Sequence, residues 1–223
     1  MKALIVGTGP GLSASFARLL AAEGYAVAVA ARRTDKLASL AAETGAALHE
    51  CDASDPAQVA TLFERAGEAE VVLYNASNRV RGAVAELDPA DVSRALQITA
   101  FGAFLVAQQA ARRMLAAGRG TILLTGATAG VKGFPNSAAF AMGKFALRGL
   151  AQSMAREMHP QGVHVVHVVV DGGIRAAARP EPADKPDSLL DPDAIARTML
   201  DLVRQPRSCW TDEIAVRPWV ERF

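Results

Sequence analysis

The chain opens with Met1-Lys2-Ala3-Leu4-Ile5-Val6-Gly7-Thr8-Gly9-Pro10-Gly11-Leu12-Ser13, an apolar run that leads directly into a glycine cluster and then into helical sequence. Glycines at such a turn let the backbone bend tightly and approach a pyrophosphate, which rests on the N-terminus of the following helix. A glycine cluster alone would also suit a structural turn. Here it lies between a strand and a helix at the start of an alternating βαβ pattern, and this context favours dinucleotide binding.

Apolar β-type runs alternate with Ala- and Leu-rich helical stretches along the whole chain. The expected strands are 3–6, 26–30, 47–50, 71–75, 121–125, 163–170 and 213–216. The expected helices are 12–23, 36–43, 56–66, 89–117, 137–159 and 192–204. Because the strands are continuously apolar, helices should cover both faces of a parallel sheet. The sequence therefore predicts an α/β fold, a single doubly wound Rossmann domain over residues 1–223 with about seven parallel strands.

Composition and charge limit the classes of partner. The 223 residues are 51% hydrophobic and carry a net charge of +1, which gives no reason to expect nucleic acid or an anionic membrane as a partner. Cys51 and Cys209 match no metal spacing and are expected to be reduced thiols, and no metal is expected. The longest apolar stretch, 163–170, is interrupted by His164 and His167 and is too short to span a bilayer. We expect a soluble, cytoplasmic protein.

The tripeptide Ala31-Arg32-Arg33 follows the second expected strand and bears on the choice of cofactor. An NAD-binding chain usually places an acidic residue here to hold the ribose hydroxyls. Ala31 removes that acid, and the forked guanidinium groups of Arg32 and Arg33 suit a 2′-phosphate. The alternative is that both arginines are solvated residues before a helix. The pattern favours NADP(H) as the cofactor.

These landmarks, in this order, resemble those of the short-chain dehydrogenase/reductase superfamily, and the resemblance covers essentially the whole chain. It implies that the glycine cluster binds the dinucleotide through Gly7, Gly9, Gly11 and Leu12. It also implies that Asp52 and Ala53 flank the adenine and that Asn75 and Ala76 lie beside the ribose. Lys144 would hydrogen-bond the nicotinamide ribose, and Ile174, in the sequence Val170-Asp171-Gly172-Gly173-Ile174, would meet the carboxamide.

The resemblance fails where the family carries its catalytic hydroxyls. Phe140 and Lys144 are one helical turn apart and share a face, and the family has Tyr at the first of these positions. There the ammonium lowers the pKa of the phenol, which can then act as an acid or base. The family's Ser and Asn correspond to Ala127 and Thr99. Only Lys144 matches the catalytic set, which is typical of a divergent subgroup with Phe for Tyr that also shares the C-terminal sequence 210–223.

Ala127 and Phe140 are expected to line the substrate site together with Phe134 and Met142, so a small apolar carbonyl or alcohol should fit. Candidates for a replacement proton donor include Thr128 and, by analogy with the family, Asp171. The alternative for Asp171 is a purely structural role, as an aspartate that stabilises a turn. Tyr74, His164 and His167 are expected in the core or, for the histidines, at a sheet edge. The proline-rich segment 172–191 should form a mobile lid loop.

Two classes of function fit these observations. The first is an NADP(H)-dependent oxidoreductase with an incomplete catalytic set and a changed proton path. The second is a non-catalytic NADP(H)-binding protein, acting as a sensor or partner subunit. The helices 89–117 and 137–159 carry more apolar residues than one sheet-facing stripe needs, and related enzymes pair these helices between subunits. We therefore expect a homodimer or homotetramer.

Overall fold

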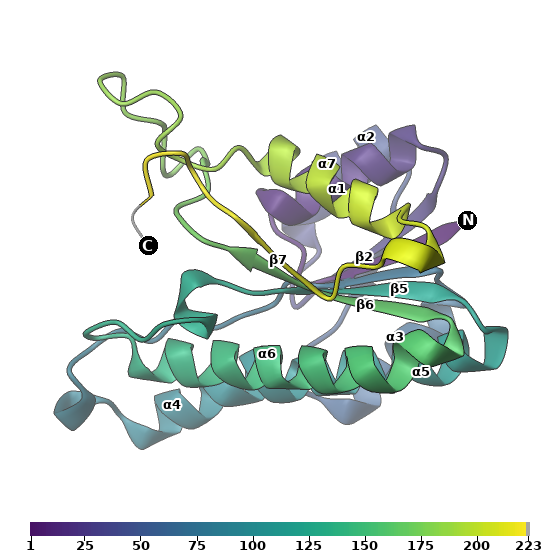
Figure 1. The fold of residues 1–223 in the computed structure, drawn as a ribbon, viewed down its shortest axis with the longest axis horizontal. Helices are drawn as coiled ribbons and strands as arrows, with labels where there is room; N and C mark the ends of the chain where they lie inside the picture. Colours follow the sequence, from purple (N-terminus) through teal and green to yellow (C-terminus); the bar gives the residue numbers. More distant parts are fainter. Residues whose placement is uncertain (222–223) are drawn as a thin grey trace.

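A computed structural model describes residues 1–221 of the chain. Its centre is a sheet of seven strands in the order β3-β2-β1-β4-β5-β6-β7, in which every neighbouring pair is parallel (Figure 1). The strands are β1 (Lys2–Val6), β2 (Ala26–Ala31), β3 (Ala47–Glu50), β4 (Val71–Tyr74), β5 (Gly120–Thr125), β6 (Val163–Val170) and β7 (Glu213–Val216). The predicted single-domain Rossmann fold with a seven-stranded parallel sheet is confirmed, and strand ends differ from prediction by one residue at most.

Helices cover both faces of this sheet (Figure 1). One layer contains α1 (Leu12–Ala22), α2 (Ala38–Thr44) and α7 (Pro192–Val203). The other contains α3 (Pro56–Ala66), α4 (Pro89–Leu96), α5 (Gly102–Ala117) and α6 (Ala138–Met158). Asp55, Asp88 and Asp191 cap α3, α4 and α7 by accepting backbone N–H groups, and each precedes a proline that starts the helix.

Two apolar cores separate the layers, because successive side chains of a strand point to opposite faces of the sheet. Leu4 and Val6 of β1 join the core beneath α3, α5 and α6. Ala3 and Ile5 of the same strand join the core beneath α1, α2 and α7. The continuous apolar character of the strands thus arises from burial on both faces.

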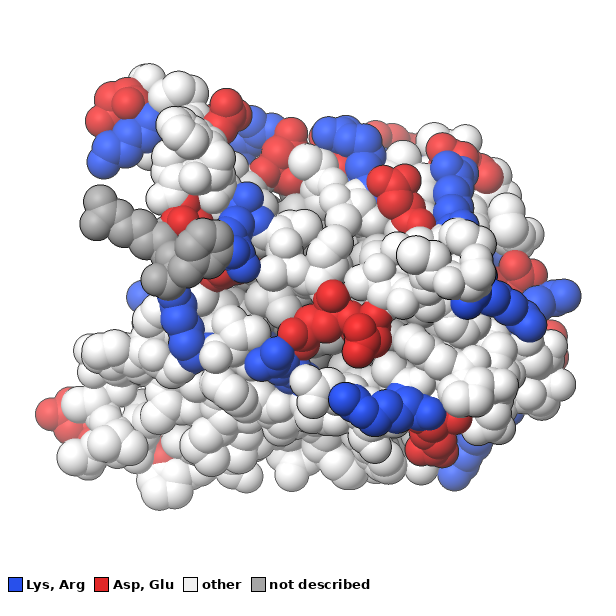
Figure 2. Space-filling model, viewed as in Figure 1, with Lys and Arg blue, Asp and Glu red and all other residues white. Residues whose placement is uncertain are grey.

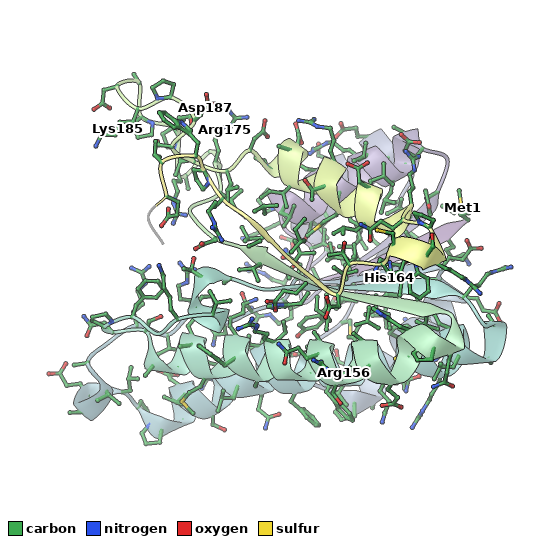
Figure 3. All side chains as sticks on the ribbon, viewed as in Figure 1. Met1, Arg156, His164, Arg175, Lys185 and Asp187 are labelled. Carbon is green, nitrogen blue, oxygen red and sulfur yellow. The ribbon has the colours of Figure 1, made fainter. Side chains whose placement is uncertain are left out.

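Strand β6 is buried along its whole length, and its two histidines belong to the interior. The His164 ring stacks on Trp210, with 4.7 Å between ring centroids, and its Nε2 lies 2.9 Å from the Thr211 carbonyl oxygen. Figure 3 labels His164 within the body of the protein. His167 Nδ1 lies 2.9 Å from a carboxylate oxygen of Glu213 on β7. The predicted core position of both histidines agrees with this burial.

The predicted helix 89–117 is divided by one π-helical turn. α4 ends at Leu96, the π-helical turn covers Gln97–Phe101, and α5 begins at Gly102. The whole stretch Pro89–Ala117 is long and apolar enough, by length and composition alone, to cross a membrane, a test that core helices of soluble proteins also pass. In this fold it packs against α3 and α6.

Residues 171–191 connect β6 to α7 and project from the body of the protein (Figure 1). Figure 3 shows Lys185 and Asp187 in the projecting part. At its base, Ile174 forms a parallel bridge with Leu190 that holds the two ends of the loop together. The lid role of 172–191 stays a prediction. The predicted C-terminal segment 210–223 contains β7, and its last residues, Arg222 and Phe223, lie outside the described residues.

Candidate functional site

The larger of two adjacent cavities lies at the carboxyl ends of β1, β2, β3 and β4 and has a volume of about 580 Å³. Ligands of open parallel sheets bind at this edge, where the strand order reverses between β1 and β4. Most of the sequence-predicted cofactor residues line it, namely Gly7, Gly9, Arg32, Arg33, Asp52, Ala53, Asn75 and Ala76. The fold therefore brings together side chains and backbone from four separate strand ends.

The glycine loop leaves its backbone bare toward this cavity. Gly7 has a φ of +84°, and a Cβ there would lie 2.3 Å from the backbone nitrogen of Ala76, so only glycine fits without displacement. A Cβ added at Gly9 would meet no atom within 4 Å and would project into open space. The backbone at Gly9 can therefore be approached closely, which a pyrophosphate requires.

Ser13, at the position of the family's third glycine, ties the glycine loop to the end of β4. Its hydroxyl donates to the Gly7 carbonyl oxygen at 3.3 Å and accepts from Asn75 Nδ2 at 2.7 Å. Asn75 N also donates to the Val6 carbonyl oxygen at 2.8 Å. The three bonds fix the position of Asn75 at the wall of the cavity.

Arg32 and Arg33 follow Ala31 at the carboxyl end of β2, and both side chains are exposed. Asp52 is the one acidic residue among the lining residues of the cavity in the described part of the chain. Its Oδ1 accepts from the backbone nitrogen and the hydroxyl of Ser54, at 2.9 and 2.6 Å, and is therefore already engaged. Among residues 1–221 no ion pair joins Asp52 or another acid to Arg32 or Arg33, so both guanidinium groups can meet a negatively charged ligand.

A second cavity of about 340 Å³ lies where β5 and β6 end. It is lined by the predicted substrate residues Ala127 and Phe140, by Phe134, and by Arg79 and Arg81. Ser77 lines the first cavity and Arg79 the second, so the segment after β4 borders both. The two arginines make the lining more polar than the sequence led us to expect.

Met142, predicted to line the substrate site, does not. Its side chain is 51% exposed and is absent from the lining of the second cavity. Each residue of an α-helix turns about 100°, so a residue two positions from Phe140 lies nearly opposite to it. Phe140, by contrast, is 5% exposed and faces the cavity.

Lys144 is buried beneath Phe140, as its position one turn along α6 predicts. Its Nζ lies 5.8 Å from the centre of the Phe140 ring and donates to the Thr125 carbonyl oxygen at 2.6 Å. Burial, and secondarily the positive charge of Arg79, lowers the pKa of Lys144 to about 8. The group can therefore change its protonation state near neutral pH.

Thr99, which the resemblance aligns with the family's catalytic Asn, is buried in the π-helical turn. Its hydroxyl accepts from the backbone nitrogen of Asn78 at 3.2 Å. Tyr74 is also buried, and its hydroxyl donates to the Ile98 carbonyl oxygen. Burial raises the pKa of Tyr74, and the predicted core position of this residue agrees with its surroundings.

Asp171, the predicted ionisable group near the nicotinamide, is 4% exposed and does not line either cavity. Its Oδ2 pairs with Arg217 Nε at 3.2 Å. Within residues 1–221, its Oδ1 has no hydrogen-bond partner. Asp171 is therefore held in an ion pair outside the lining of both cavities, and its role as a replacement proton donor stays a prediction.

Four predicted cofactor residues lie outside the lining of both cavities: Gly11, Leu12, Lys144 and Ile174. Sequence reasoning missed Arg79 and Arg81, and in the first cavity also Thr8, Pro10, Lys36, Leu37, Cys51 and Ile98. Most of these residues come shortly after the carboxyl end of a strand, and this position in the sequence could have identified them as lining residues.

No group of three or more His, Cys, Asp or Glu side chains in the described part of the chain could hold a metal ion.

Comparisons with known proteins agree with this geometry. The family model for short chain dehydrogenases matches residues 1–185. The cyclic-di-GMP-binding biofilm dispersal mediator protein of Escherichia coli (strain K12) is 32% identical over 196 residues, which cover 87% of this chain and 81% of that protein. The trans-4-hydroxycyclohexanecarboxylate dehydrogenase of Sinomonas cyclohexanicum is 33% identical over 178 residues, which cover 73% and 68%. A metagenomic short-chain oxidoreductase in complex with NADP matches with a TM-score of 0.84 and 26% identity, covering 99% of this chain and 98% of that one. The chain therefore belongs to the short-chain dehydrogenase/reductase family.

Proposed function

We propose that the protein is an NADP(H)-dependent oxidoreductase that acts on a small carbonyl compound or alcohol in the cavity between Ala127 and Phe140. The observation that carries the proposal is the pair of cavities at the carboxyl ends of the strands. The first has a bare glycine loop and two arginines, and the second is lined by Phe140, beneath which Lys144 is buried. Ser77 lines the first cavity and Arg79 lines the second. The NADP complex of a metagenomic relative supports the choice of cofactor class.

The residues present fit a dinucleotide with a 2′-phosphate. The backbone around Gly7 and Gly9 would take the pyrophosphate, because no side chain blocks it there. Arg32 and Arg33 would hold the 2′-phosphate with charge-assisted hydrogen bonds. The other residues of the proposed set are Gly11, Leu12, Asp52, Ala53, Asn75, Ala76, Lys144 and Ile174. When bound, NADPH supplies the hydride for carbonyl reduction.

Proton supply differs from the family mechanism because residue 140 carries no hydroxyl. Thr128 and Ser137 are the hydroxyl-bearing side chains among the described residues that line the second cavity. Lys144, with a pKa of about 8, lies beneath Phe140 and can tune the electrostatics of the cavity floor. General acid help from a positioned group contributes roughly 10²–10⁴ in rate, so we expect turnover slower than in complete family members.

A second candidate function is a non-catalytic NADP(H)-binding protein that acts as a sensor or partner subunit. The observation that favours it is the replacement of both cavity hydroxyls by Ala127 and Phe140 while the first cavity keeps its glycine loop. One relative, the biofilm dispersal mediator, is likewise named for binding a nucleotide rather than for a reaction.

The test begins with the cofactor. We expect NADPH to bind at least about tenfold more tightly than NADH, since one charge-assisted contact to the phosphate contributes that much. Arg32→Asp should reverse the preference, and Arg112→Gln, which changes an exposed arginine outside both cavities, should not. Equal affinity of the parent for NADPH and NADH would rule out the assignment. Hydride transfer to a panel of aldehydes, ketones and diketones then separates the enzyme from the binding protein.

We also propose that the protein is a cytoplasmic homodimer or homotetramer that pairs its α4–α5 and α6 surfaces. Several large apolar side chains are exposed on these helices and the turn between them: Phe101, Phe104, Met142 and Phe145. The rings of Phe101 and Phe104 stack on each other, with 6.2 Å between centroids, and so form one apolar face.

The two free cysteines, Cys51 and Cys209, are consistent with the proposed cytoplasmic location, because the cytoplasm is a reducing compartment.

A further inference from the structure

We propose that the substrate carries a carboxylate or phosphate group, and that Arg79 and Arg81 bind this group in the second cavity. The proposal rests on the proposed oxidoreductase function and narrows its substrate class. The expected small apolar carbonyl compound is thereby replaced by an anionic one. Arg79 and Arg81 line this cavity, although the family pattern gives neither residue a role and no sequence motif contains them.

Arg79 is stacked on the residue that replaces the catalytic Tyr. Its Cζ lies 4.5 Å from the centre of the Phe140 ring, which is the distance of a cation–π contact. The Nζ of Lys144 lies 5.8 Å from the same centre. The contact with the ring restricts the guanidinium plane, so less freedom is lost when an anion binds to its forked N–H groups.

The segment that carries both arginines is fixed on either side of them. On one side, Asn78 N donates to the Thr99 hydroxyl at 3.2 Å. On the other side, Gly82 N donates to the Asn136 carbonyl oxygen at 3.3 Å. Asn136 itself lines the second cavity. The backbone that carries Arg79 and Arg81 is therefore held between two anchors, and both exposed side chains line one cavity.

The charges at this cavity are unbalanced. Arg79 and Arg81 are its charged lining residues in the described part of the chain, and no Asp or Glu accompanies them. Elsewhere, arginines such as Arg148 and Arg175 pair with carboxylates, whereas no ion pair joins Arg79 or Arg81 to any residue within 1–221. Figure 2 shows basic and acidic side chains interspersed over the face that it displays, so that face as a whole carries no such excess.

The neighbouring cations strengthen this imbalance. Partial burial and the positive charges of Arg81 and Arg179 lower the pKa of Arg79, although the group remains cationic at neutral pH. A bound anion would relieve the repulsion among these guanidinium groups, since an opposite charge favours the charged form of each. The cavity of about 340 Å³ has room for a small metabolite.

Binding is tested first, without turnover. Ligand-detected NMR on the protein saturated with NADP⁺ measures the affinity of acetoacetate against methyl acetoacetate, and of dihydroxyacetone phosphate against dihydroxyacetone. The anionic member of at least one pair should bind about tenfold or more tightly, because charge-assisted bonds are roughly twice as strong as neutral ones. The pair with the larger ratio identifies carboxylate or phosphate as the group. Ratios near one in both pairs would overturn the proposal.

Two variants locate the site. Arg79→Gln and Arg81→Gln each keep the polar side chain but remove the charge, and each should reduce the preference for the anion about tenfold or more. The control Arg112→Gln removes an exposed arginine of α5 that lines neither cavity and should leave the preference unchanged. NADPH affinity serves as the folding control for all three variants. An anion preference that survives both cavity variants contradicts the assignment.

Failure of this proposal can be told apart from failure of the proposed function. Anion binding that depends on Arg79, without reduction of any probe by NADPH, supports the subsite and rejects the oxidoreductase. Reduction of the anionic and the neutral member of each pair with equal efficiency, in the parent and in both cavity variants, supports the oxidoreductase and rejects the subsite.

Discussion

Replacing Gly9 by alanine should weaken NADPH binding without destabilising the fold, whereas replacing Gly7 by alanine should do both. A Cβ at Gly9 meets no atom within 4 Å, and the φ of Gly9 lies outside the left-handed region. Its methyl group would instead enter the cavity of about 580 Å³ at the proposed pyrophosphate position. Gly7 has a φ of +84°, and its Cβ would lie 2.3 Å from Ala76 N.

The magnitudes follow from these contacts. For Gly7→Ala, the left-handed conformation costs about 1–2 kcal/mol and the overlap with Ala76 about 1–3 kcal/mol more. The sum of about 2–5 kcal/mol should lower the Tm by roughly 5–15 °C in a chain of this size. For Gly9→Ala, overlap with the bound pyrophosphate of about 1–3 kcal/mol should raise the Kd for NADPH roughly 5- to 150-fold, while the Tm without cofactor stays within about 1 °C.

Two measurements decide the outcome. Circular dichroism gives the Tm of each variant without cofactor, and fluorescence titration gives the Kd for NADPH. If Gly9→Ala binds NADPH like the parent, the glycine loop does not hold the pyrophosphate and the assignment of the first cavity is wrong. If Gly9→Ala loses as much stability as Gly7→Ala, the space around Gly9 is not open in solution.

Three further predictions concern chemistry, pH and assembly. The double variant Ala127→Ser with Phe140→Tyr should create or raise carbonyl reductase activity above that of Phe140→Tyr alone, because it places hydroxyls at both positions. No gain in activity on a panel of aldehydes, ketones and diketones would indicate that the cavity itself has diverged. The folded pKa of Lys144, about 8 against an ordinary 10.5, means that the folded state binds fewer protons between these values. Parent stability should therefore rise relative to Lys144→Met by about 3 kcal/mol between pH 8 and 10.5, measured by urea unfolding. Light scattering at micromolar protein should give a dimer or tetramer that Phe104→Asp weakens, and a monomeric parent would contradict the proposed interface.

Much of the fold was predictable because its signals are local. The apolar runs, the glycine turn and the Asp-Pro helix starts each act within a few residues, and the strands and caps formed where expected. The π-helical turn at Gln97–Phe101 was not predicted, since no proline interrupts the sequence there and the single Gly102 that follows is tolerated within many helices. Its consequence is long-range: it contains Thr99, whose hydroxyl holds Asn78 across the chain.

The candidate site was only partly predictable for a related reason. The position of Arg32 and Arg33 follows directly from the end of a strand, and both line the first cavity. Arg79 and Arg81 also follow a strand, but their place at the second cavity depends on bonds to Thr99 and Asn136, distant in sequence. A charge pattern alone could not distinguish them from solvated arginines.

Three positions that the resemblance aligns with the family's catalytic set lie around Arg79. The Thr99 hydroxyl accepts from the backbone nitrogen of Asn78, next to Arg79. The Phe140 ring centre lies 4.5 Å from Arg79 Cζ, and Ala127 lines the same cavity as Arg79. Because residues of one catalytic set share a site, replacements at these positions change the surroundings of the same guanidinium group.

The burial of Lys144 bears on whether the protein is an enzyme or a binding protein. A buried ammonium whose only hydrogen bond in the described residues is to the Thr125 carbonyl oxygen destabilises the fold at neutral pH. An apolar residue would fill the same space without this cost, so the folded structure gains nothing from the charge. The ammonium lies 5.8 Å from the centre of the Phe140 ring, which lines the second cavity together with Arg79 and Arg81. If the protein is the proposed reductase, this positive charge adds to the potential where a substrate carbonyl would develop negative charge, a contribution that a site without hydroxyls at residues 127 and 140 still needs.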